Sequence, residues 1–167
     1  MLIYHPAFDA NHCVYRIVSI LSATQKDISW PLLRILDFYY LFPGQLKKLS
    51  PWPKEIQKYK SLVKQVPDEY ESITNPARVF FDLESFQKTA ILELIAKGVL
   101  SKSSFDQGVM KLESESISQD YKVNLVSDPF VNSPAFKVIT EALPVVQFGG
   151  MNGLKKRSGL MEYIYDL

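Results

Sequence analysis

The first third of the chain carries apolar residues at the spacing of an amphipathic helix. Asp9 is of a residue type that caps helices, and the apolar positions after it are Cys13, Ile17, Ile20 and Leu21. Intervals of three and four residues place these side chains on one helix face, so we predict a helix that begins after Asp9. The polar residues 23–27 end this pattern.

A second helix is predicted to begin at Ser29, which can cap it, with Pro31 in the first turn, where proline is tolerated. Nine of the eleven residues in 32–42 are apolar, and only Arg34 and Asp37 interrupt them. Because these two residues are three apart, we expect them to pair along one side of the helix. A helix that is apolar nearly all round is buried on more than one face, so this one is either the central core element or a partner contact.

The middle of the chain is more polar. Residues 54–64 predict an exposed, basic helix. The segment that follows is rich in polar residues and bounded by prolines, and we interpret residues 67–78 as a connector. The predicted organisation is therefore an N-terminal half, 1–66, and a C-terminal half, 79–167, on either side of this connector.

The second half opens with three apolar residues, 79–81, which are a candidate for a short strand. Asp82 then caps a predicted helix that Gly98 ends, since glycine is common just after a helix. Ser103 and Asp106 resemble a capping box in front of a further run at helical spacing. A helix, a short turn and a second helix give the outline of a helix-turn-helix motif.

The last third predicts one more helix and two extended segments. Residues 121–126 alternate loosely between polar and apolar types and predict a strand. Ser133 and Pro134 begin a helix. Glycines surround the basic run 155–157, and residues 160–167 alternate with period two, which predicts a β-hairpin, or wing, with a basic tip. The predicted fold class is mainly α with small β wings, in a tandem winged-helix-like (helix-turn-helix) architecture.

Composition and charge narrow the class of protein. The chain of 167 residues is 47% hydrophobic and 22% charged, which is typical of a globular protein. Its net charge of +1 gives no overall field that would attract nucleic acid or an anionic membrane. The sequence shows no signal peptide and no run of about 18 apolar residues, and Cys13 is the only cysteine. We therefore expect a cytoplasmic protein in a reducing compartment, without contact to a membrane.

Candidate catalytic chemistry is sparse. Four residues near the N-terminus, His5, Asp9, His12 and Cys13, have a spacing that metal ligands can have. The alternative interpretation, which we favour, makes Asp9 a helix cap and Cys13 part of the apolar face. Phosphate-binding, zinc-protease and serine-hydrolase motifs are absent from the sequence. We expect no enzymatic activity, no metal site and no cofactor.

A role in DNA binding has mixed support. The second helix of the predicted motif offers Gln107 and Lys111 to bases, but Asp106 and Glu113 would repel phosphates. The stronger basic feature is the predicted hairpin tip with Lys155, Lys156 and Arg157. It could contact phosphate, or an acidic face of a protein partner. The alternative is that the tip is only a solvated turn.

Aromatic residues make up 13% of the chain, and such residues are enriched both in cores and at interfaces. Tyr39, Tyr40 and Phe42 lie at the end of the apolar helix. We predict them as candidates for docking a partner, because aromatic side chains make good interface anchors. The alternative is that all three belong to the core.

Four segments resemble one known family in the order in which they occur. They are YHPAFDANHCVYRIVSIL, LLRILDFYYLFPG, FQKTAILELIAKGVL and GLKKRSGLMEY. The family is the middle component of bacterial three-component ABC-ATPase conflict systems, the group that includes Lamassu. The shared motifs are packing motifs, and the resemblance spans most of the chain.

The resemblance implies a role in defence against phages and plasmids. Such systems pair an SMC/Rad50-like ABC ATPase with an effector, often a nuclease, and a small middle subunit. The resemblance implies that this subunit is winged-helix-like and non-catalytic, and that it bridges the ATPase and the effector. Contact with DNA would come through the complex. The alternative function is a stand-alone helix-turn-helix transcriptional regulator, which would dimerise and present a basic recognition helix.

Overall fold

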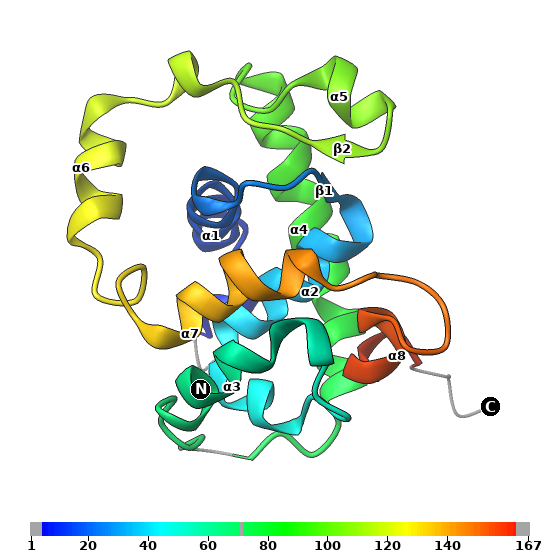
Figure 1. Cartoon of the computed structure of the whole chain (residues 1–167). Helices are drawn as coiled ribbons and strands as arrows, with labels where there is room; N and C mark the ends of the chain where they lie inside the picture. The colour runs from blue at the N-terminus through cyan, green and yellow to red at the C-terminus, as the bar shows by residue number, and fades with distance from the viewer. Residues whose placement is uncertain (1–4, 71, 163–167) are drawn as a thin grey trace, which may run out of the picture.

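The computed structural model describes residues 5–70 and 72–162 of the chain (Figure 1). Its longer helices are α1 (Ala10–Ala23), α2 (Trp30–Leu41), α4 (Pro76–Ala96) and α6 (Gln119–Ser127). The short helices are α3 (Lys60–Lys64), α5 (Lys102–Asp106), α7 (Pro134–Lys137) and α8 (Leu154–Ser158). Short segments of 3₁₀ or π helix are Pro6–Phe8, Pro43–Lys48, Lys54–Tyr59, Ser114–Ser116, Val138–Ala142, Leu143–Val145 and Leu160–Glu162.

Two short strands, β1 (Ile28–Ser29) and β2 (Val109–Met110), form a small antiparallel sheet. Ile28 pairs with Met110, and Ser29 pairs with Val109. An isolated antiparallel bridge joins Leu100 and Leu112, two residues beyond the end of β2. The prediction of a mainly helical fold with little β structure is confirmed.

The first two helices begin where the sequence predicts. The Asp9 carboxylate accepts hydrogen bonds from the backbone N–H groups of Asn11, at 2.8 Å, and His12, at 3.3 Å, and so caps α1. The Ser29 hydroxyl accepts one from Leu32 N at 3.3 Å and caps α2, with Pro31 in the first turn. Both caps satisfy backbone donors that a helix leaves unpaired at its N-terminus.

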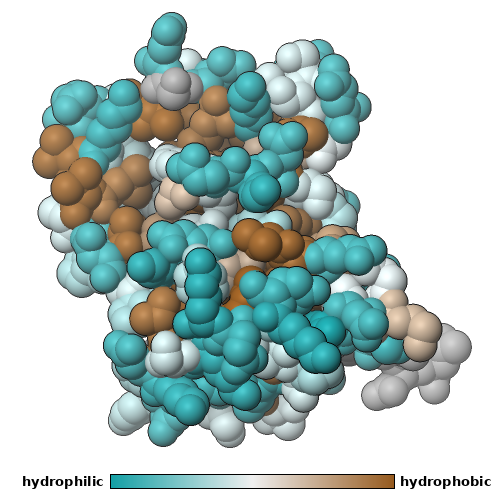
Figure 2. All heavy atoms as spheres, viewed as in Figure 1, coloured by the Kyte–Doolittle hydropathy of each residue, from teal (hydrophilic) through white to brown (hydrophobic). Residues whose placement is uncertain are grey.

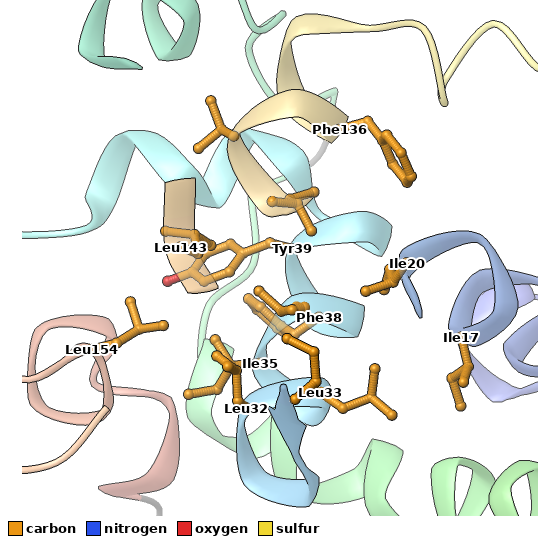
Figure 3. Packing of buried hydrophobic residues seen from close by; sticks show 14 of the residues in the cluster. Ile17, Ile20, Leu32, Leu33, Ile35, Phe38, Tyr39, Phe136, Leu143 and Leu154 are labelled. Atoms are coloured by element: carbon orange, nitrogen blue, oxygen red, sulfur yellow. The ribbon is translucent and has the colours of Figure 1, made fainter. Parts of the chain in front are cut away.

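Helix α2 is the centre of the hydrophobic core (Figure 3). Leu33 and Phe38 are at most 1% exposed, and side chains from α1, from residues 134–145 and from α8 surround them. Helix α4 packs along α1 and also contacts α2. One continuous cluster of buried residues thus draws on segments from both predicted halves. The division at residues 67–78 stays a prediction, and the core is shared across it.

The predicted strand at 79–81 is wrong, because these residues belong to α4. Asn75 caps that helix by accepting a hydrogen bond from Arg78 N at 3.1 Å, seven residues before the predicted cap Asp82. Phe80 is 2% exposed and its neighbour Phe81 is 37% exposed. An apolar run of three residues fits a helix as well as a strand, and the upstream cap decides between them.

The second helix of the predicted helix-turn-helix motif is much shorter than expected. Ser101, not Ser103, caps α5, which ends at Asp106. Gly108 follows with a φ of 82°, a conformation that favours glycine, and the chain continues into β2. The helical spacing predicted through Val109 and Leu112 is therefore wrong, since both lie in extended backbone.

Two predicted extended segments are also helical. Residues 121–126 lie in α6, which Ser118 caps through Tyr121 N at 3.2 Å. Residues 154–158 form α8, and not one side of a hairpin. The last residues of the predicted hairpin, 163–167, lie outside the described residues. The predicted basic helix at 54–64 exists as a 3₁₀ segment and α3, with non-helical backbone at Ile56.

Helix α7 begins at Pro134 and is capped by Ser133, as predicted. It continues as a π turn and a 3₁₀ turn through Val145. Among the described residues, no helix combines the length and apolar character needed to cross a membrane.

Candidate functional site

The three basic residues predicted for partner or phosphate contact lie on α8. Lys155 and Lys156 are exposed, but Arg157 is half-buried. Its guanidinium donates hydrogen bonds to the backbone oxygens of Asn152 and Pro51, both at 2.6 Å. Arg157 therefore holds two loops together, and the prediction that three charges project from a hairpin tip is wrong. Contact of Lys155 and Lys156 with phosphate or with an acidic partner stays a prediction.

The position of α8 depends on a glycine. A Cβ atom at Gly153 would lie 2.2 Å from the Gly149 backbone oxygen, so no larger residue fits there without a shift of the backbone. Leu154 N also donates to Gln147 O at 2.8 Å. The helix is thus anchored closely to the loop in front of it.

The three aromatic residues predicted for docking have different environments. Tyr39 is 2% exposed and belongs to the core. Tyr40 is half-buried and packs on Phe130, with ring centroids 4.4 Å apart. Phe42 is half-buried and stacks on His5 at 5.9 Å. Tyr39 has no surface to offer a partner in this fold, and docking by the other two stays a prediction.

A network of buried polar side chains joins α1, α2 and α4. Arg16 and Asp37, both fully buried, form an ion pair with two hydrogen bonds, of 2.6 and 3.1 Å. Gln87, 1% exposed, donates to Asp37 at 2.9 Å and accepts from Arg34 Nε at 3.0 Å. The predicted pairing of Arg34 with Asp37 is wrong, because Asp37 points to α1. In the described part of the chain, every buried side-chain nitrogen and oxygen has a hydrogen-bond partner.

The N-terminal candidates for metal binding have structural contacts instead. His5 Nδ1 accepts from Ala7 N at 3.1 Å, and Asp9 caps α1. His12 Nδ1 lies 2.8 Å from Arg16, and burial, followed by the Arg16 charge, lowers the pKa of His12. Burial, reinforced by the Asp37 charge, raises the pKa of the Cys13 thiol well above its usual range. No group of three or more metal-ligating side chains gathers within residues 5–70 and 72–162.

Several hollows open on the surface of the described structure, and two of them are both large and mostly apolar. The first, the connector cleft, has a volume of about 840 Å³. The N-terminal turn, the end of α2, the connector and the loop before α7 line it. Its apolar side chains include Phe8, Leu41, Phe42, Val66, Ile73 and Phe130. Phe8 is 45% exposed and Tyr70, at the rim, is fully exposed.

The second hollow, the arm groove, has a volume of about 740 Å³ and lies under the arm, residues 113–128, which contains α6. The end of α1, the loop to β1 and β2 form its other walls. Its apolar side chains include Leu21, Leu112, Ile117, Leu125, Val126 and Val131. Figure 1 shows the arm standing beside α1, and Figure 2 shows apolar residues gathered over it at the left edge.

Few contacts attach the arm to the body. Tyr121 packs on Tyr15, with ring centroids 5.4 Å apart. The Tyr121 hydroxyl also donates a hydrogen bond to the backbone oxygen of Tyr15 at 3.1 Å. Tyr15 in turn donates its hydroxyl to the Asp128 carboxylate at the end of the arm. Burial and this hydrogen bond raise the pKa of Tyr15 to about 12. Leu125 is the only buried side chain in α6.

One loop separates the two hollows. Residues 129, 130 and 133–135 line the connector cleft, and Val131 and Asn132 line the arm groove. No residue of the described part of the chain lines both hollows. Asp128 Oδ1 accepts from Phe130 N at 2.8 Å, and Asn132 Nδ2 donates to Asp128 O at 2.9 Å, so the loop is bonded within itself.

A family model described as the ABC-three component (ABC-3C) system Middle Component 5 matches residues 2–166. The chain belongs to that family. The resemblance to a middle component of three-component ABC systems is thereby confirmed at the level of the family. No curated protein and no solved structure matches this middle component.

The arm groove of this middle component was not predicted from the sequence. Residues 121–126 alternate loosely, and a strand in that place would have left no arm. The signal that was available is Ser118, a residue type that caps helices, three residues before Tyr121. Phe42, one of the predicted docking residues, lines the connector cleft, and its docking role stays a prediction.

Proposed function

We propose that this chain is a non-catalytic bridging subunit of a three-component complex, in which one hollow binds an ABC ATPase and the other binds the effector. Membership in the Middle Component 5 family supports the association with an ABC system. The observation that carries the bridging role is the pair of apolar hollows with separate linings. A bridge needs two docking surfaces that can be occupied at once.

Both hollows have the character of protein interfaces. Large apolar side chains that stay exposed beside polar rims mark interaction sites in soluble proteins. Tyr70, fully exposed, lies at the connector cleft, and Val126, 78% exposed, lies at the arm groove. Aromatic residues, which are frequent interface anchors, line the connector cleft.

The environment of the single thiol supports a role without catalysis. A nucleophilic cysteine needs a lowered pKa and access to substrate. Cys13 is fully buried, and burial raises its pKa. His12 hydrogen-bonds Arg16 and is not aimed at the thiol by any contact in the described structure.

We further propose that the complex serves defence against phages or plasmids, with an SMC/Rad50-like ATPase and a nuclease-type effector. These details come from the resemblance to the Lamassu group. The rival function, a stand-alone regulator that reads DNA, loses support from α5, which has five residues and ends before Gln107. Lys111, the other candidate for base contact, lies beside β2 and lines the arm groove.

We propose that α1, α2, α4 and the small sheet form a winged-helix-like unit within the helical architecture, and the tandem arrangement of two such units stays a prediction. The elements follow in the order α1, β1, α2, α4 and β2, with β1 antiparallel to β2 and an isolated bridge from Leu100 to Leu112 just after β2. The connector and α3 are inserted between α2 and α4. Small subunits built on this pattern work by docking as readily as by reading DNA.

The test is co-purification of the three components from cells that express all of them, with the tag on the ATPase. We expect the wild-type chain to bring the effector into the complex. Tyr70→Asp should release one partner, and Val126→Asp should release the other. Val145→Asp changes a valine that is 51% exposed and lines neither hollow, so it should retain both.

The bridging proposal fails if the wild-type chain binds neither component. It fails equally if both substitutions release the same partner, because the two hollows would then form one interface. Specific binding of an operator DNA by the isolated chain at physiological salt would favour the regulator instead. Melting curves of the variants show whether a lost partner reflects lost folding.

A further inference from the structure

The charges around the arm groove are unbalanced. Lys26, Lys111 and Lys122 stand exposed at its rim. Within the described structure none of them has an ion-pair partner, whereas other lysines, Lys47, Lys48, Lys88 and Lys97, pair with carboxylates of the same chain. Among the described residues that line the groove, Asp27 is the only acidic one. The rim therefore presents three cations against one anion.

The floor between these lysines is apolar. Leu21, Ile117 and Val126 contribute to it, and Val126 is 78% exposed. An apolar floor within a basic rim matches a segment that carries apolar side chains on one face and carboxylates at its edges. Burial of the apolar side chains would supply affinity, and the lysines would select and orient the segment.

Single-stranded nucleic acid fits this groove poorly. Proteins that bind it combine a basic path with aromatic side chains on which the bases stack. No aromatic residue is among the described residues that line the groove. Its aliphatic side chains therefore give bases no surface for stacking.

The connector cleft differs from the arm groove in its side chains, which suits a different occupant. Aromatic side chains line it, and the acidic residues Asp68 and Glu69 stand at its rim. Both carboxylates already pair with lysines of this chain, Lys47 and Lys48. Two hollows with different charge and side-chain type can discriminate between two partners.

We infer that the arm groove binds an acidic, amphipathic segment of one of the two partner proteins. The inference rests on the proposed bridging function and specifies the chemistry of one of its two contacts. Rim lysines contribute to orientation and to the rate of association, so the interaction should weaken with salt.

Charge reversal tests the inference with the purified ATPase and the purified effector as separate probes. Lys111→Glu with Lys122→Glu should weaken binding of one partner about tenfold and leave the other unchanged. The matched control is Lys54→Glu with Lys137→Glu, which reverses two exposed lysines that line neither hollow. The control should bind both partners like the wild type.

The outcomes separate the inference from the bridging proposal. If the wild-type chain binds neither probe, bridging fails. If it binds both and the Lys111/Lys122 variant binds equally well at low salt, bridging stands and the inference is overturned. A variant that loses affinity for single-stranded DNA and for neither protein would also overturn it.

A photo-crosslinking residue at Val126, in the reconstituted complex, identifies the occupant. We expect a crosslink to a partner segment with more carboxylates than basic residues and with apolar residues between them. The control carries the photo-crosslinking residue at position 123 instead, because Val123 is on the same helix but does not line the groove. A crosslink to a basic segment, to DNA or to a second copy of this chain overturns the inference, as does the absence of any crosslink from Val126.

Discussion

The central helices and the arm are held by different physical means. Hydrogen bonds among the buried side chains Arg16, Asp37 and Gln87 connect α1, α2 and α4. Every buried polar atom of these three side chains has a hydrogen-bond partner. In α6, Leu125 is the only buried residue, and Val123 and Val126 are 55% and 78% exposed. The centre therefore determines whether the chain folds, and the arm contributes little to that.

The contrast suggests that binding takes place at the arm, where local stability is low. Regions with few buried apolar contacts open locally at a small cost in free energy, and binding elements are drawn from them. A substitution in the centre should change folding and binding together. A substitution in the arm should change binding alone, which makes the arm the better place to test a docking role.

The largest effect is expected for Asp37→Ala. It leaves the fully buried Arg16 guanidinium without its carboxylate and Gln87 without one acceptor. Breaking a buried ion pair by removing one partner typically costs about 3–5 kcal/mol, a large fraction of the stability of a small domain. Urea denaturation followed by circular dichroism measures the loss.

Two further variants sharpen that result. Asp82→Ala also removes an aspartate that pairs with an arginine, but its side chain is 49% exposed, so we expect a change within about 0.5 kcal/mol. Replacing both partners, Arg16→Met with Asp37→Leu, should lower the free energy of unfolding less than Asp37→Ala alone, because neither charge of this pair then remains buried. Equal stability of Asp37→Ala and wild type would show that the pair does not hold the centre.

The centre shows what the sequence could predict and what it could not. Caps at Asp9 and Ser29 and the apolar run at 32–42 are local signals, and the helices they predicted are present. The partner of Asp37 is not a local signal. Spacing along one helix suggested Arg34, but tertiary packing brings Arg16, 21 residues away, into contact.

A smaller effect is expected for Tyr15→Phe, which removes the hydroxyl that donates to Asp128 at the end of the arm. Hydrogen bonds to charged groups contribute about 1.5–3 kcal/mol, and partial exposure here lowers that to about 1 kcal/mol. The loss should fall on the arm. Hydrogen exchange should accelerate in residues 119–127 and stay unchanged in α2.

Tyr59→Phe is the matched control, since its hydroxyl makes a long, exposed contact of 3.5 Å with Glu141. It should leave exchange in the arm unchanged. Faster exchange in α2 after Tyr15→Phe would mean that the arm supports the core, contrary to the contrast between the two regions.

The arm and the C-terminal helix were the least predictable parts of the fold. Residues 121–126 and 154–158 are short and lack a strong hydrophobic period, so weak alternation and glycines suggested extended structure. Their helices depend on tertiary contacts: Tyr121 packs on Tyr15, and Arg157 bonds the backbone at Pro51. Neither contact is visible in a local window of sequence.

The smallest effect is a pH dependence at the start of α1. Burial and the Arg16 charge lower the pKa of His12 in the folded chain below its usual value of 6.5. The unfolded chain then binds more protons, so this contribution to stability is present above pH 6.5 and is lost as the pH falls through the folded pKa. His12→Gln should reduce the slope of stability against pH between about 7 and 5.

Denaturation midpoints at several pH values in this window measure the slope. Asn11→Gln, an exposed change one residue away, should retain the wild-type slope. If His12→Gln also retains the wild-type slope, the folded state does not disfavour protonation of His12. The contact between His12 and Arg16 would then not contribute to the pH dependence of stability.

The loop between the two hollows has a consequence for the order of assembly. Its inner hydrogen bonds, from Phe130 N to Asp128 and from Asn132 to Asp128, join residues 128–132 to one another. We therefore expect an occupant that shifts Val131 in one hollow to shift Phe130 in the other. Such coupling is reciprocal: each occupant changes the affinity for the other by the same factor. A subunit built in this way would register whether both of its neighbours are present, and not only hold them.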